Sequence, residues 1–572
     1  MNTKVSEIDK KPKHIGGSVL PARGEPFLWV MGGTLAIGIS MIIGFLVLIF
    51  WNGLVTFFPK PIHVLTLKDG SLLAGEPIRE EYYKPGKEQL EMLDAATREH
   101  IKRAQGFASR TLYHTGNFDL YNEDYRWVSD YEVAKTTLPA HVFFIERVEW
   151  GPFIGFPESL RAGSEIISKA SVSYGLLNAQ HHEAVERREQ ILRIERSDIG
   201  KINRRIESER LALRRAALKH GENSNEYRKV SAKYEERIAA LQGEYDKLRK
   251  EAESIKESDS QYEITLRDVN GLEKTLPLSQ VVRLYPANGL TSFRKLGVYA
   301  SRWLEFLTRE PREANTEGGV MPAIFGTFVM TVLMALAVAP FGVIAALYLR
   351  EYARQGHLVS AIRICVNNLA GVPSIVYGVF GLGFFAYIVG ATIDELFFPE
   401  RLPNPTFGTG GVLWASLTLA LLTAPVVIVA TEEALAAVPQ SMREGSLACG
   451  ASKWQTIRYV VLPKAMPGIM TGLILAMARG AGEVAPLMLV GVVKIAPELP
   501  VDGFFPYIHL ERSFMHLGFH IYDVGFQSRN SEAAKPMVFV TTLLLITLVA
   551  IMNTTAIHIR NRLKKKYYVG HF

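Results

Sequence analysis

The chain has 572 residues, of which 48% are hydrophobic and 21% are charged, and it carries a formal net charge of +7. A mean hydropathy of +0.10 is high for a soluble protein with so many charges, so apolar and charged residues must be segregated along the sequence. The net charge requires no nucleic-acid partner, because no basic cluster interleaved with aromatic residues indicates a nucleic-acid groove.

Apolar runs of about 20 residues, enough to cross roughly 30 Å of hydrocarbon, predict six transmembrane helices. We place them at residues 27–57, 321–349, 362–389, 410–430, 466–493 and 536–557. The first run is about twice as long as the core of a signal peptide and ends in Phe57-Phe58-Pro59-Lys60, so we expect it to remain as an anchor within residues 27–58. These runs predict an all-α polytopic membrane protein.

The distribution of lysine and arginine predicts the orientation of these helices. Basic residues gather in both tails, residues 1–26 and 560–572, and between the second and third spans. The loop after the third span is instead acidic, with Asp394, Glu395 and Glu400. We therefore expect a multi-pass protein of a bacterial inner membrane, with both termini in the cytoplasm and the region between the first two spans in the periplasm.

Residues 59–319 lack any run of membrane length and form a large predicted extracytoplasmic insert. Strand-like segments lie on both sides of its helical middle part, at residues 63–75, 141–150 and 261–285, and Asp69-Gly70 is typical of a hairpin turn. We expect a small β-rich subdomain into which a helical hairpin is inserted.

The helical hairpin, at residues 172–257, has the sequence pattern of an antiparallel coiled coil. The segment HGENSN, residues 220–225, supplies a tight turn between its arms. Its charged surface is a solvated face or, alternatively, a docking arm for a partner in the same compartment. Apolar residues recur every seven positions in the first arm, at Val185, Leu192, Ile199, Ile206 and Leu213.

The sequence contains no recognisable constellation of catalytic or metal-ligating residues. Phosphate-binding loop, zinc-protease and serine-hydrolase motifs are missing, so we predict neither enzymatic activity nor a metal or other cofactor. The two cysteines, Cys365 and Cys449, form no paired motif, and we expect both to be buried as small hydrophobic residues.

A half-polar stretch, EGSLACGASKWQTIRYVVLP at residues 444–463, separates the fourth and fifth spans. Residues 441–449 are compatible with a helix, Gly450 can adopt the left-handed conformation that ends it, and Ser452 can cap a second helix. Pro463 is expected to stop that second helix where the next span begins. The sequence thus predicts two short helices joined by a glycine turn at the cytoplasmic surface, within a loop of residues 431–465.

The spacing of this stretch resembles the EAA motif of ABC-importer permeases, E-A-A-x3-G-x9-I-x-L-P. Here it reads Glu444-Gly445-Ser446, then Gly450, then Val460, Leu462 and Pro463, so both alanines and the isoleucine are replaced. In that family the element is a coupling helix that docks on a cytoplasmic ATPase. The resemblance implies that the ATPase-coupling residues are Arg443, Glu444, Gly445, Ser446, Gly450, Lys453, Trp454, Leu462 and Pro463.

Three further segments resemble the phosphate-specific ABC importers, and the sequence GEVAPL at residues 482–487 looks like their PstA-type subunit. The resemblance covers the permease core, residues 320–559. It implies import of inorganic phosphate together with a PstC-type partner permease, a PstB-type ATPase dimer and a PstS-type extracytoplasmic binding protein. The segments are LAGVPSIVYGVFGLGFF at 369–385, TEEALAAVPQSMREGS at 431–446 and ARGAGEVAPLMLVG at 478–491.

Polar residues inside the predicted spans are candidates for the translocation pathway. Arg479 and Glu483, four residues apart in the predicted fifth span, lie on one helix face and can pair. Arginine suits a phosphate ligand because its guanidinium offers paired donors and stays charged. The alternative is a static ion pair that locks two helices. Pro373, Ser374 and Tyr377 accompany a break in the third span and either line the pathway or form a packing kink.

The implied mechanism is alternating access, driven by ATP binding in a separate subunit and transmitted through the helix around Gly450. The sequence alone leaves three other functions possible. They are a permease for another oxyanion such as sulfate or molybdate, a membrane-anchored coiled-coil sensor or scaffold, and a membrane enzyme with an extracytoplasmic catalytic domain.

Overall fold

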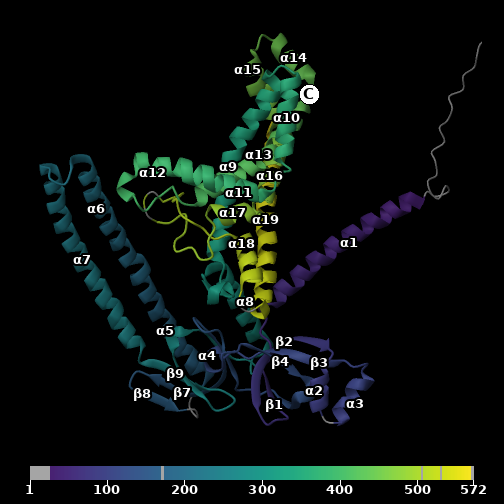
Figure 1. Ribbon diagram of the computed structural model, residues 1–572, viewed down its shortest axis with the longest axis vertical. Coiled ribbons are helices and arrows are strands. Elements are labelled where there is room, and N and C mark those ends of the chain that lie inside the picture. Colours follow the sequence, from purple (N-terminus) through teal and green to yellow (C-terminus); the bar gives the residue numbers. More distant parts are fainter. Residues whose placement is uncertain are drawn as a thin grey trace, which may run out of the picture.

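The computed structural model describes residues 26–93, 95–168, 173–503, 505, 507–528 and 531–568. Residues 1–25 of the basic N-terminal tail, the last four residues of the C-terminal tail and the first residue of the predicted coil lie outside these ranges. A bundle of long apolar helices stands between a polar β-rich region at one end and two short helices, α14 (Gln440–Ala448) and α15 (Lys453–Thr456), at the other (Figure 1).

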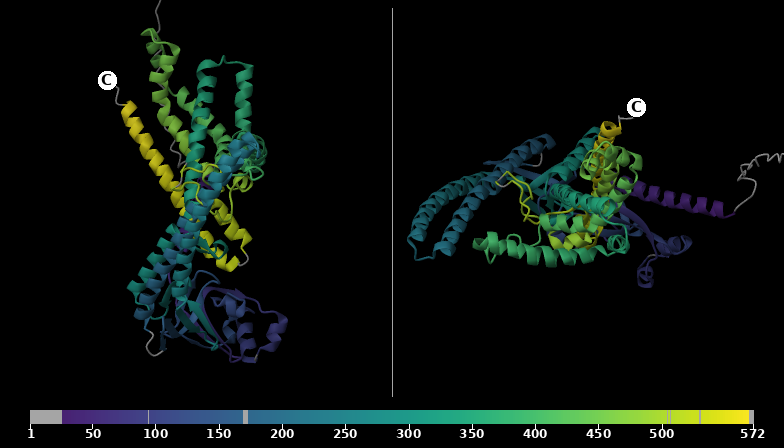
Figure 2. Two further views of the ribbon diagram at one scale, coloured as in Figure 1. Left: turned by 90° about the vertical axis from the view of Figure 1, so that its left-hand side faces the viewer. Right: turned by 90° about the horizontal axis from the view of Figure 1, so that it is seen from above.

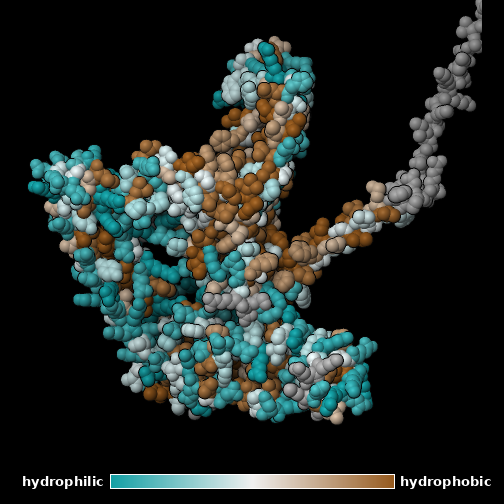
Figure 3. Space-filling model, in the orientation of Figure 1, coloured by the Kyte–Doolittle hydropathy of each residue, from teal (hydrophilic) through white to brown (hydrophobic). Residues whose placement is uncertain are grey.

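Six helices among the described residues are long and apolar enough to cross a membrane, which confirms the predicted number. Helix α1 (Pro26–Val55) contacts α19 (Ser531–Tyr568) near Gly53 and otherwise leans away from the bundle (Figure 1; Figure 2). Hydrophobic residues cover α1 and the bundle, whereas the β-rich region is largely hydrophilic (Figure 3). The candidate spans are Trp29–Val55, Met321–Tyr352, Ser374–Phe397, Val412–Ala436, Lys453–Gly480 and Ala534–Lys565.

The third span differs from its predicted bounds, because the apolar run is broken before it. Helix α10 (His357–Leu369) ends, and a new helix begins at Ser374. Pro373 lacks an amide donor and restricts the residue before it, so the chain cannot continue α10 through this point. The span consists of α11 (Ser374–Phe380), a π-helical stretch (Gly381–Gly390) and α12 (Ala391–Phe397).

The fifth span also differs from the prediction, which placed it at residues 466–493. A helix that begins at Lys453 continues through a π-helical turn (Ile457–Val461) into α16 (Leu462–Gly480) and ends there. A short helix, α17 (Ala485–Val490), follows after a turn. Two glycines and a proline between residues 480 and 486 explain the break, since both residue types disfavour a helix interior.

The centre of the bundle packs α9 (Met321–Leu347) against α13 (Val412–Ala436) and α16. Met330, Met334 and Leu419 are fully buried there. A Cβ atom on Gly342 would come within 2.6 Å of the Val427 side chain, so α9 and α13 approach closely at this glycine.

The β-rich region contains two antiparallel sheets. One has the strand order β4-β3-β2-β1-β5, and the other has the order β10-β9-β7-β6-β11 with β8 beside β7. The predicted hairpin at Asp69-Gly70 joins β1 to β2, with Gly70 at a φ of +87°. The strands are β1 (His63–Leu67), β2 (Leu72–Tyr83), β3 (Ala108–His114), β4 (Tyr125–Ser129), β5 (Val133–Thr137), β6 (Phe143–Arg147), β7 (Phe153–Ala162), β8 (Glu165–Ser168), β9 (Tyr262–Arg267), β10 (Glu273–Pro277) and β11 (Val281–Pro286).

Shorter elements complete the described chain. A small pair, β12 (Pro311–Arg312) and β13 (Glu317–Gly318), precedes α9. The remaining helices are α2 (Lys87–Met92), α3 (Ala95–Arg103), α4 (Phe118–Tyr121), α8 (Ser292–Thr308) and α18 (Leu517–Tyr522), with 3-10 turns at Asp130–Glu132, Leu278–Gln280, Glu313–Asn315 and Pro399–Arg401 and π-helical turns at Tyr348–Tyr352 and Asp523–Gln527.

The segment between β8 and β9 forms two long antiparallel arms. In the first arm, α5 (Tyr174–Leu192) passes through a π-helical turn (Arg193–Asp198) into α6 (Ile199–His220), and α7 (Asn225–Asp259) is the second arm. The arms meet at the predicted turn, where Gly221 has a φ of +79° and Ser224 Oγ accepts a hydrogen bond from the Tyr227 amide at 3.0 Å.

The burial pattern of the first arm differs from the predicted heptad. The five predicted seam residues, from Val185 to Leu213, are half-buried rather than buried. Before the π-helical turn, the buried residues keep a seven-residue spacing but lie one position before the predicted seam residues Val185 and Leu192. The turn then shifts the phase of the helix face that follows it, which a constant seven-residue repeat does not allow for. The coiled-coil geometry therefore stays a prediction. The buried residues of the arm are Leu177, Ala184, Ile191, Ile194 and Ile202.

The first arm also reaches two loops of the bundle. Arg204 lies 3.0 Å from Glu498, in the segment after the fifth span, and Arg215 donates to Glu400 at 2.5 Å, after the third span. Glu498 is also paired with Arg512 at 2.7 Å. Helix α6 thus bridges loops that are distant in sequence, and Figure 1 shows it beside α12.

Both cysteines are exposed, so their predicted burial is wrong. Cys365 lies on α10, and Cys449 directly follows α14. These short helices lie at the end of the bundle rather than inside it, and an apolar sequence context therefore did not imply burial.

Candidate functional site

The half-polar stretch forms a helix-turn-helix at the end of the bundle opposite the β-rich region (Figure 1). Gly450 follows α14 with a φ of +85°. Ser452 Oγ then accepts from the Gln455 amide at 3.3 Å, and the Gln455 side chain accepts from the Ser452 amide at 2.7 Å. The glycine turn and the cap of α15 therefore occur at the residues that the sequence predicts.

Pro463 does not end the second short helix, contrary to the prediction. The helix continues through Ile457–Val461, and Pro463 is the second residue of α16. A π-helical turn before a proline reduces the demand for the amide donor that proline lacks. Leu462 packs beside Val461 and Ala465 in a small core that includes Leu435 of α13. The helix is therefore continuous from α15 to the end of the fifth span.

Arg443 is the main anchor of α14. Its guanidinium donates to the carbonyls of Leu435 and Val438, at 2.7 and 2.6 Å, and to Glu351 at 3.0 Å. The side chains of Arg443 and Glu351 are 20% and 13% exposed. Ser446 Oγ is within 3.0 Å of Thr456 Oγ1 and links α14 to α15. Sequence reasoning missed Glu351 and Thr456. The position of Glu351, a single acidic residue at the end of an apolar span, was a possible signal.

The other predicted coupling residues lie on the outer side of this element. Trp454 is 56% exposed, and Glu444, Gly445 and Gly450 are exposed as well. The exposed Lys453 places its ammonium 4.9 Å from the ring centre of Tyr352. A projecting helix pair with an exposed tryptophan is a surface suited to contact with another protein.

Arg479 and Glu483 form the predicted ion pair, with 3.5 Å between Nε and Oε1. They are not on one continuous helix, however, because α16 ends at Gly480 and Glu483 lies in the turn before α17. The Arg479 side chain is 39% exposed and the Glu483 side chain 20%. The pair is therefore partly accessible on the surface of this chain.

Pro373, Ser374 and Tyr377 are brought near this pair, because α11 packs against α17. A Cβ atom on Gly378 would lie 2.7 Å from Pro486 Cα. Tyr377 is buried, and its hydroxyl donates to the Leu369 carbonyl at 2.8 Å. Tyr377 thus holds together the break between α10 and α11, whereas Pro373 is exposed and Ser374 half-buried.

A cleft of about 1380 Å³ lies between the β-rich region and the membrane helices, beside the ends of α1 and α19. Carboxylates gather around Gly151: a Cβ atom there would lie 3.8 Å from both Asp124 Oδ1 and Glu317 Oε1, and the Gly151 amide donates to Glu313 at 3.4 Å. Burial raises the pKa of Glu317 to about 7 and, together with Glu313, that of Asp124 to about 6. The charge of this cleft therefore changes near neutral pH.

Comparison with known proteins places most of the bundle in one family. Residues 338–565 match the family described as "Binding-protein-dependent transport system inner membrane component". The matched range includes the glycine turn, the Arg479–Glu483 pair and the break before α11.

Curated relatives match part of the chain. The probable ABC transporter permease protein YqgH of Bacillus subtilis (strain 168) is 37% identical over 217 residues, 37% of this chain and 66% of that protein. Phosphate transport system permease protein PstA 1 of Mycobacterium tuberculosis (strain H37Rv) is 38% identical over 195 residues, 34% of this chain and 58% of that protein. The probable phosphate transport system permease protein PstA of Methanocaldococcus jannaschii is 31% identical over 229 residues, 40% of this chain and 71% of that protein. The chain thus spans less than two thirds of the length of the first two relatives.

Proposed function

The chain belongs to the PstA-type permeases of ABC importers, and from this premise we propose that it forms one wall of the pathway of an ATP-driven importer of inorganic phosphate. ATP hydrolysis belongs to a separate subunit. The proposed assembly adds a PstC-type partner permease, a PstB-type ATPase dimer and a PstS-type binding protein. The observation that carries this proposal is the exposed helix-turn-helix α14–α15, which is continuous with the fifth span.

We propose that α14 and α15 dock on the ATPase through Glu444, Lys453 and Trp454. Their exposure supports this role, as do the inward anchors of the element, Arg443 and Ser446, which leave the outer side for a partner. ATP-driven closure of the ATPase dimer then displaces the element, and the continuous helix carries the displacement into the membrane.

The same contact sets the proposed orientation. An ATPase in the cytoplasm requires α14 and α15 to lie on the cytoplasmic side, so the β-rich region at the opposite end lies in the periplasm (Figure 1). There it can meet the binding protein that delivers the ligand. The arms α5–α6 and α7 then form a periplasmic antiparallel coiled coil, and the ion pairs of Arg204 and Arg215 support a fixed position of that coil over two periplasmic loops.

We propose that Arg479 faces the pathway together with Glu483, Pro373 and Ser374, with Tyr377 as a support. Partial exposure of Arg479 in this chain fits a pathway whose other wall comes from the partner permease. A guanidinium that is only partly engaged by Glu483 retains donors for a phosphate oxygen. The ion pair limits the cost of holding the charge in the membrane while the pathway is empty.

Uptake of labelled phosphate at micromolar concentration tests this function. Cells that lack the chain should regain uptake with the intact sequence but not with Arg479→Ala at equal membrane abundance, and Arg479→Lys should restore only part of it because lysine has no bidentate fork. Unlabelled phosphate should compete.

Competitor anions separate the alternatives. Competition by sulfate or molybdate instead of phosphate would assign a different oxyanion to the same permease. Uptake that is unaffected by the presence of the chain would refute a transport role and favour the sensor or scaffold reading, in which the six spans only anchor the insert.

A further inference from the structure

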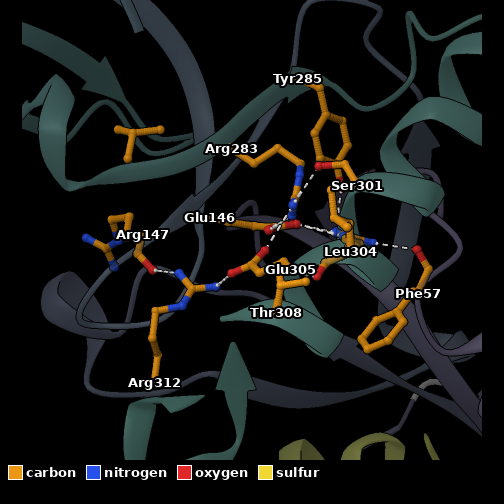
Figure 4. Close-up of polar contacts among 12 residues, drawn as sticks. Phe57, Glu146, Arg147, Arg283, Tyr285, Ser301, Leu304, Glu305, Thr308 and Arg312 are labelled. Carbon is orange, nitrogen blue, oxygen red and sulfur yellow. Dashed lines mark hydrogen bonds and ion pairs between the residues drawn. The ribbon is translucent and has the colours of Figure 1, made fainter. Parts of the chain in front are cut away.

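Helix α8 joins the last strand of the β-rich region to the second span, and one of its faces holds an ion network (Figure 4). Arg302 donates to Glu146 on β6 at 2.7 Å and to the Phe57 carbonyl, just after α1, at 3.1 Å. Glu305 accepts from Arg283 on β11 at 2.9 Å and from Arg312 at 2.5 Å. Burial opposes the ionisation of Glu146, yet Arg302 and Arg283 hold its pKa below the usual value. This face fixes α8 to both sheet strands.

A second face of α8 packs on the ends of the membrane helices. The rings of Trp303 and Phe306 lie 5.1 and 5.2 Å from that of Phe57. Phe306 is fully buried in a core that includes Ala323 of α9 and Met537 of α19. Helix α8 therefore lies at the level where the first, second and sixth spans end on the side of the insert.

A third face carries a continuous apolar stripe that no part of the described chain covers. Its residues follow steps of three and four, so they lie on one side of the helix. We name this set the α8 stripe: Phe293 (85% exposed), Leu296 (56%), Ala300, Leu304 (64%) and Leu307 (40%).

The direction of the α8 stripe identifies what covers it. Leu304 and Arg302 are two residues apart and therefore about 160° apart around the helix axis, so the stripe points away from the strands that hold Arg302. The opposite side of α8 is the polar β-rich region, and the neighbouring α1 is exposed and apolar along most of its length. Basic residues, Arg294 and Lys295, stand at the start of the helix. An apolar stripe with flanking cations at the level of the span ends has the chemistry of an interfacial helix.

We propose that α8 lies in the surface of the bilayer, with the α8 stripe in contact with the acyl chains just below the headgroups of the leaflet on the insert's side. The insert then rests on the membrane through α8. The ion network transmits this anchoring to β6 and β11, so the lipid surface sets the orientation of the β-rich region relative to the spans.

Two label positions, two residues apart on α8, test the proposal in the full chain. The chain is assembled with the partner permease and ATPase in bilayers of phosphatidylethanolamine and phosphatidylglycerol. Cys365 and Cys449 are replaced by serine, and an environment-sensitive fluorophore is placed at Leu296→Cys or, as a matched control, at Arg294→Cys on the other side of α8. Lipids brominated near the top of the acyl chain should quench the Leu296 label about threefold more than the control, and its emission should shift to the blue. The same measurement is made on the chain without the partner permease. A difference between the two samples would show that the partner permease, and not lipid, covers the α8 stripe in the assembly.

Three results would overturn the proposal. Equal quenching at both positions would mean that α8 is not oriented with its stripe toward lipid, and no quenching at either would place it in water. Quenching at Leu296 that is present in the chain alone but lost in the full assembly would assign the stripe to the partner permease. Both substitutions replace exposed side chains, so none of the three results depends on a damaged fold.

Discussion

The two ends of the molecule hold their charged residues in opposite ways. At the insert end, Glu146 and Glu305 each pair with two arginines in a network that is largely buried. At the α14–α15 end, Arg443 is the main inward anchor, and most of the predicted coupling side chains are exposed. A densely bonded end resists displacement, whereas an end held by few contacts can move as a unit. We therefore propose that motion enters the bundle at α14–α15 and that the insert serves as its fixed end.

The largest expected effect comes from breaking the fixed end. Arg302→Met removes the bonds to Glu146, Tyr285 and the Phe57 carbonyl and leaves a buried carboxylate with one arginine. The free energy of unfolding of the β-rich region should fall by about 3 to 5 kcal/mol, as when one member of a buried ion network is lost. Denaturant unfolding of the full chain in detergent measures this loss, with limited proteolysis of the insert as the probe of its unfolding.

Arg294→Met is the matched control on the same helix, since Arg294 is exposed. Its stability should change by less than about 0.5 kcal/mol. Equal losses in the two variants would show that the network does not fix the insert.

A smaller effect is a change of stability with pH, which comes from Glu317 at the junction between the insert and the bundle. Burial raises the pKa of Glu317 to about 7, with Glu146, Glu313 and Asp124 nearby and Arg312 opposing them, whereas the unfolded value is 4.5. The folded chain therefore binds more protons between these values, and the stability from this group is present at low pH and lost as pH rises through 7. Glu317→Gln keeps the neutral form and should be more stable than the parent at pH 8, by about 1 to 3 kcal/mol.

Thermal unfolding at pH 5 and pH 8 measures this difference. The gain should be clearly smaller at pH 5 than at pH 8, because at pH 5 Glu317 of the folded parent is protonated and only its unfolded state is partly ionised. A gain of the same size at both pH values would show that the variant acts through packing and not through the titration of Glu317.

The smallest change in stability should nevertheless have a clear effect on coupling. Gly450→Ala introduces a side chain at a φ of +85°, which costs about 1 kcal/mol, although no atom lies within 4 Å of the new Cβ. The strain should change the angle between α14 and α15, so phosphate uptake should fall relative to ATP hydrolysis. Both rates are measured in proteoliposomes that contain the whole complex.

Gly445→Ala makes the same substitution five positions earlier, inside α14. It also has open space around the new Cβ, but its backbone is helical. Coupling should be unchanged and stability equal or higher by up to about 1 kcal/mol, because alanine favours a helix. Uncoupling by Gly445→Ala and not by Gly450→Ala would contradict the role of the glycine turn.

The features that could be predicted from the sequence are those that neighbouring residues determine. Hydrophobic runs are sufficient for the number of spans, and Gly450, Ser452 and Gln455 determine the turn and the cap through local hydrogen bonds. The break at Pro373 follows in the same way from the missing donor of proline. The end of the fifth span at Gly480 was missed, because an apolar run does not reveal where its hydrogen bonds stop.

The features that could not be predicted depend on contacts between distant segments. Arg302 of α8 meets Glu146 of β6, and Arg443 meets Glu351 at the end of another span. No local pattern pairs one charge with another at such separations. The π-helical turn after Leu192 likewise changes which residues are buried in the part of the first arm that follows it, without a clear signal in the heptad pattern.

A cross-link from the native Cys449, which is exposed beside Gly450, tests the central claim most directly. In the assembled complex with Cys365→Ser, a short bifunctional reagent should join Cys449 to the ATPase, with a yield that differs between the nucleotide-free and ATP-bound states. A cysteine in place of the exposed Lys247 on α7, in a chain that also carries Cys449→Ser, should give no such product. A cross-link to the ATPase from α7 but not from Cys449 would contradict both the coupling role of α14–α15 and the proposed orientation of the chain.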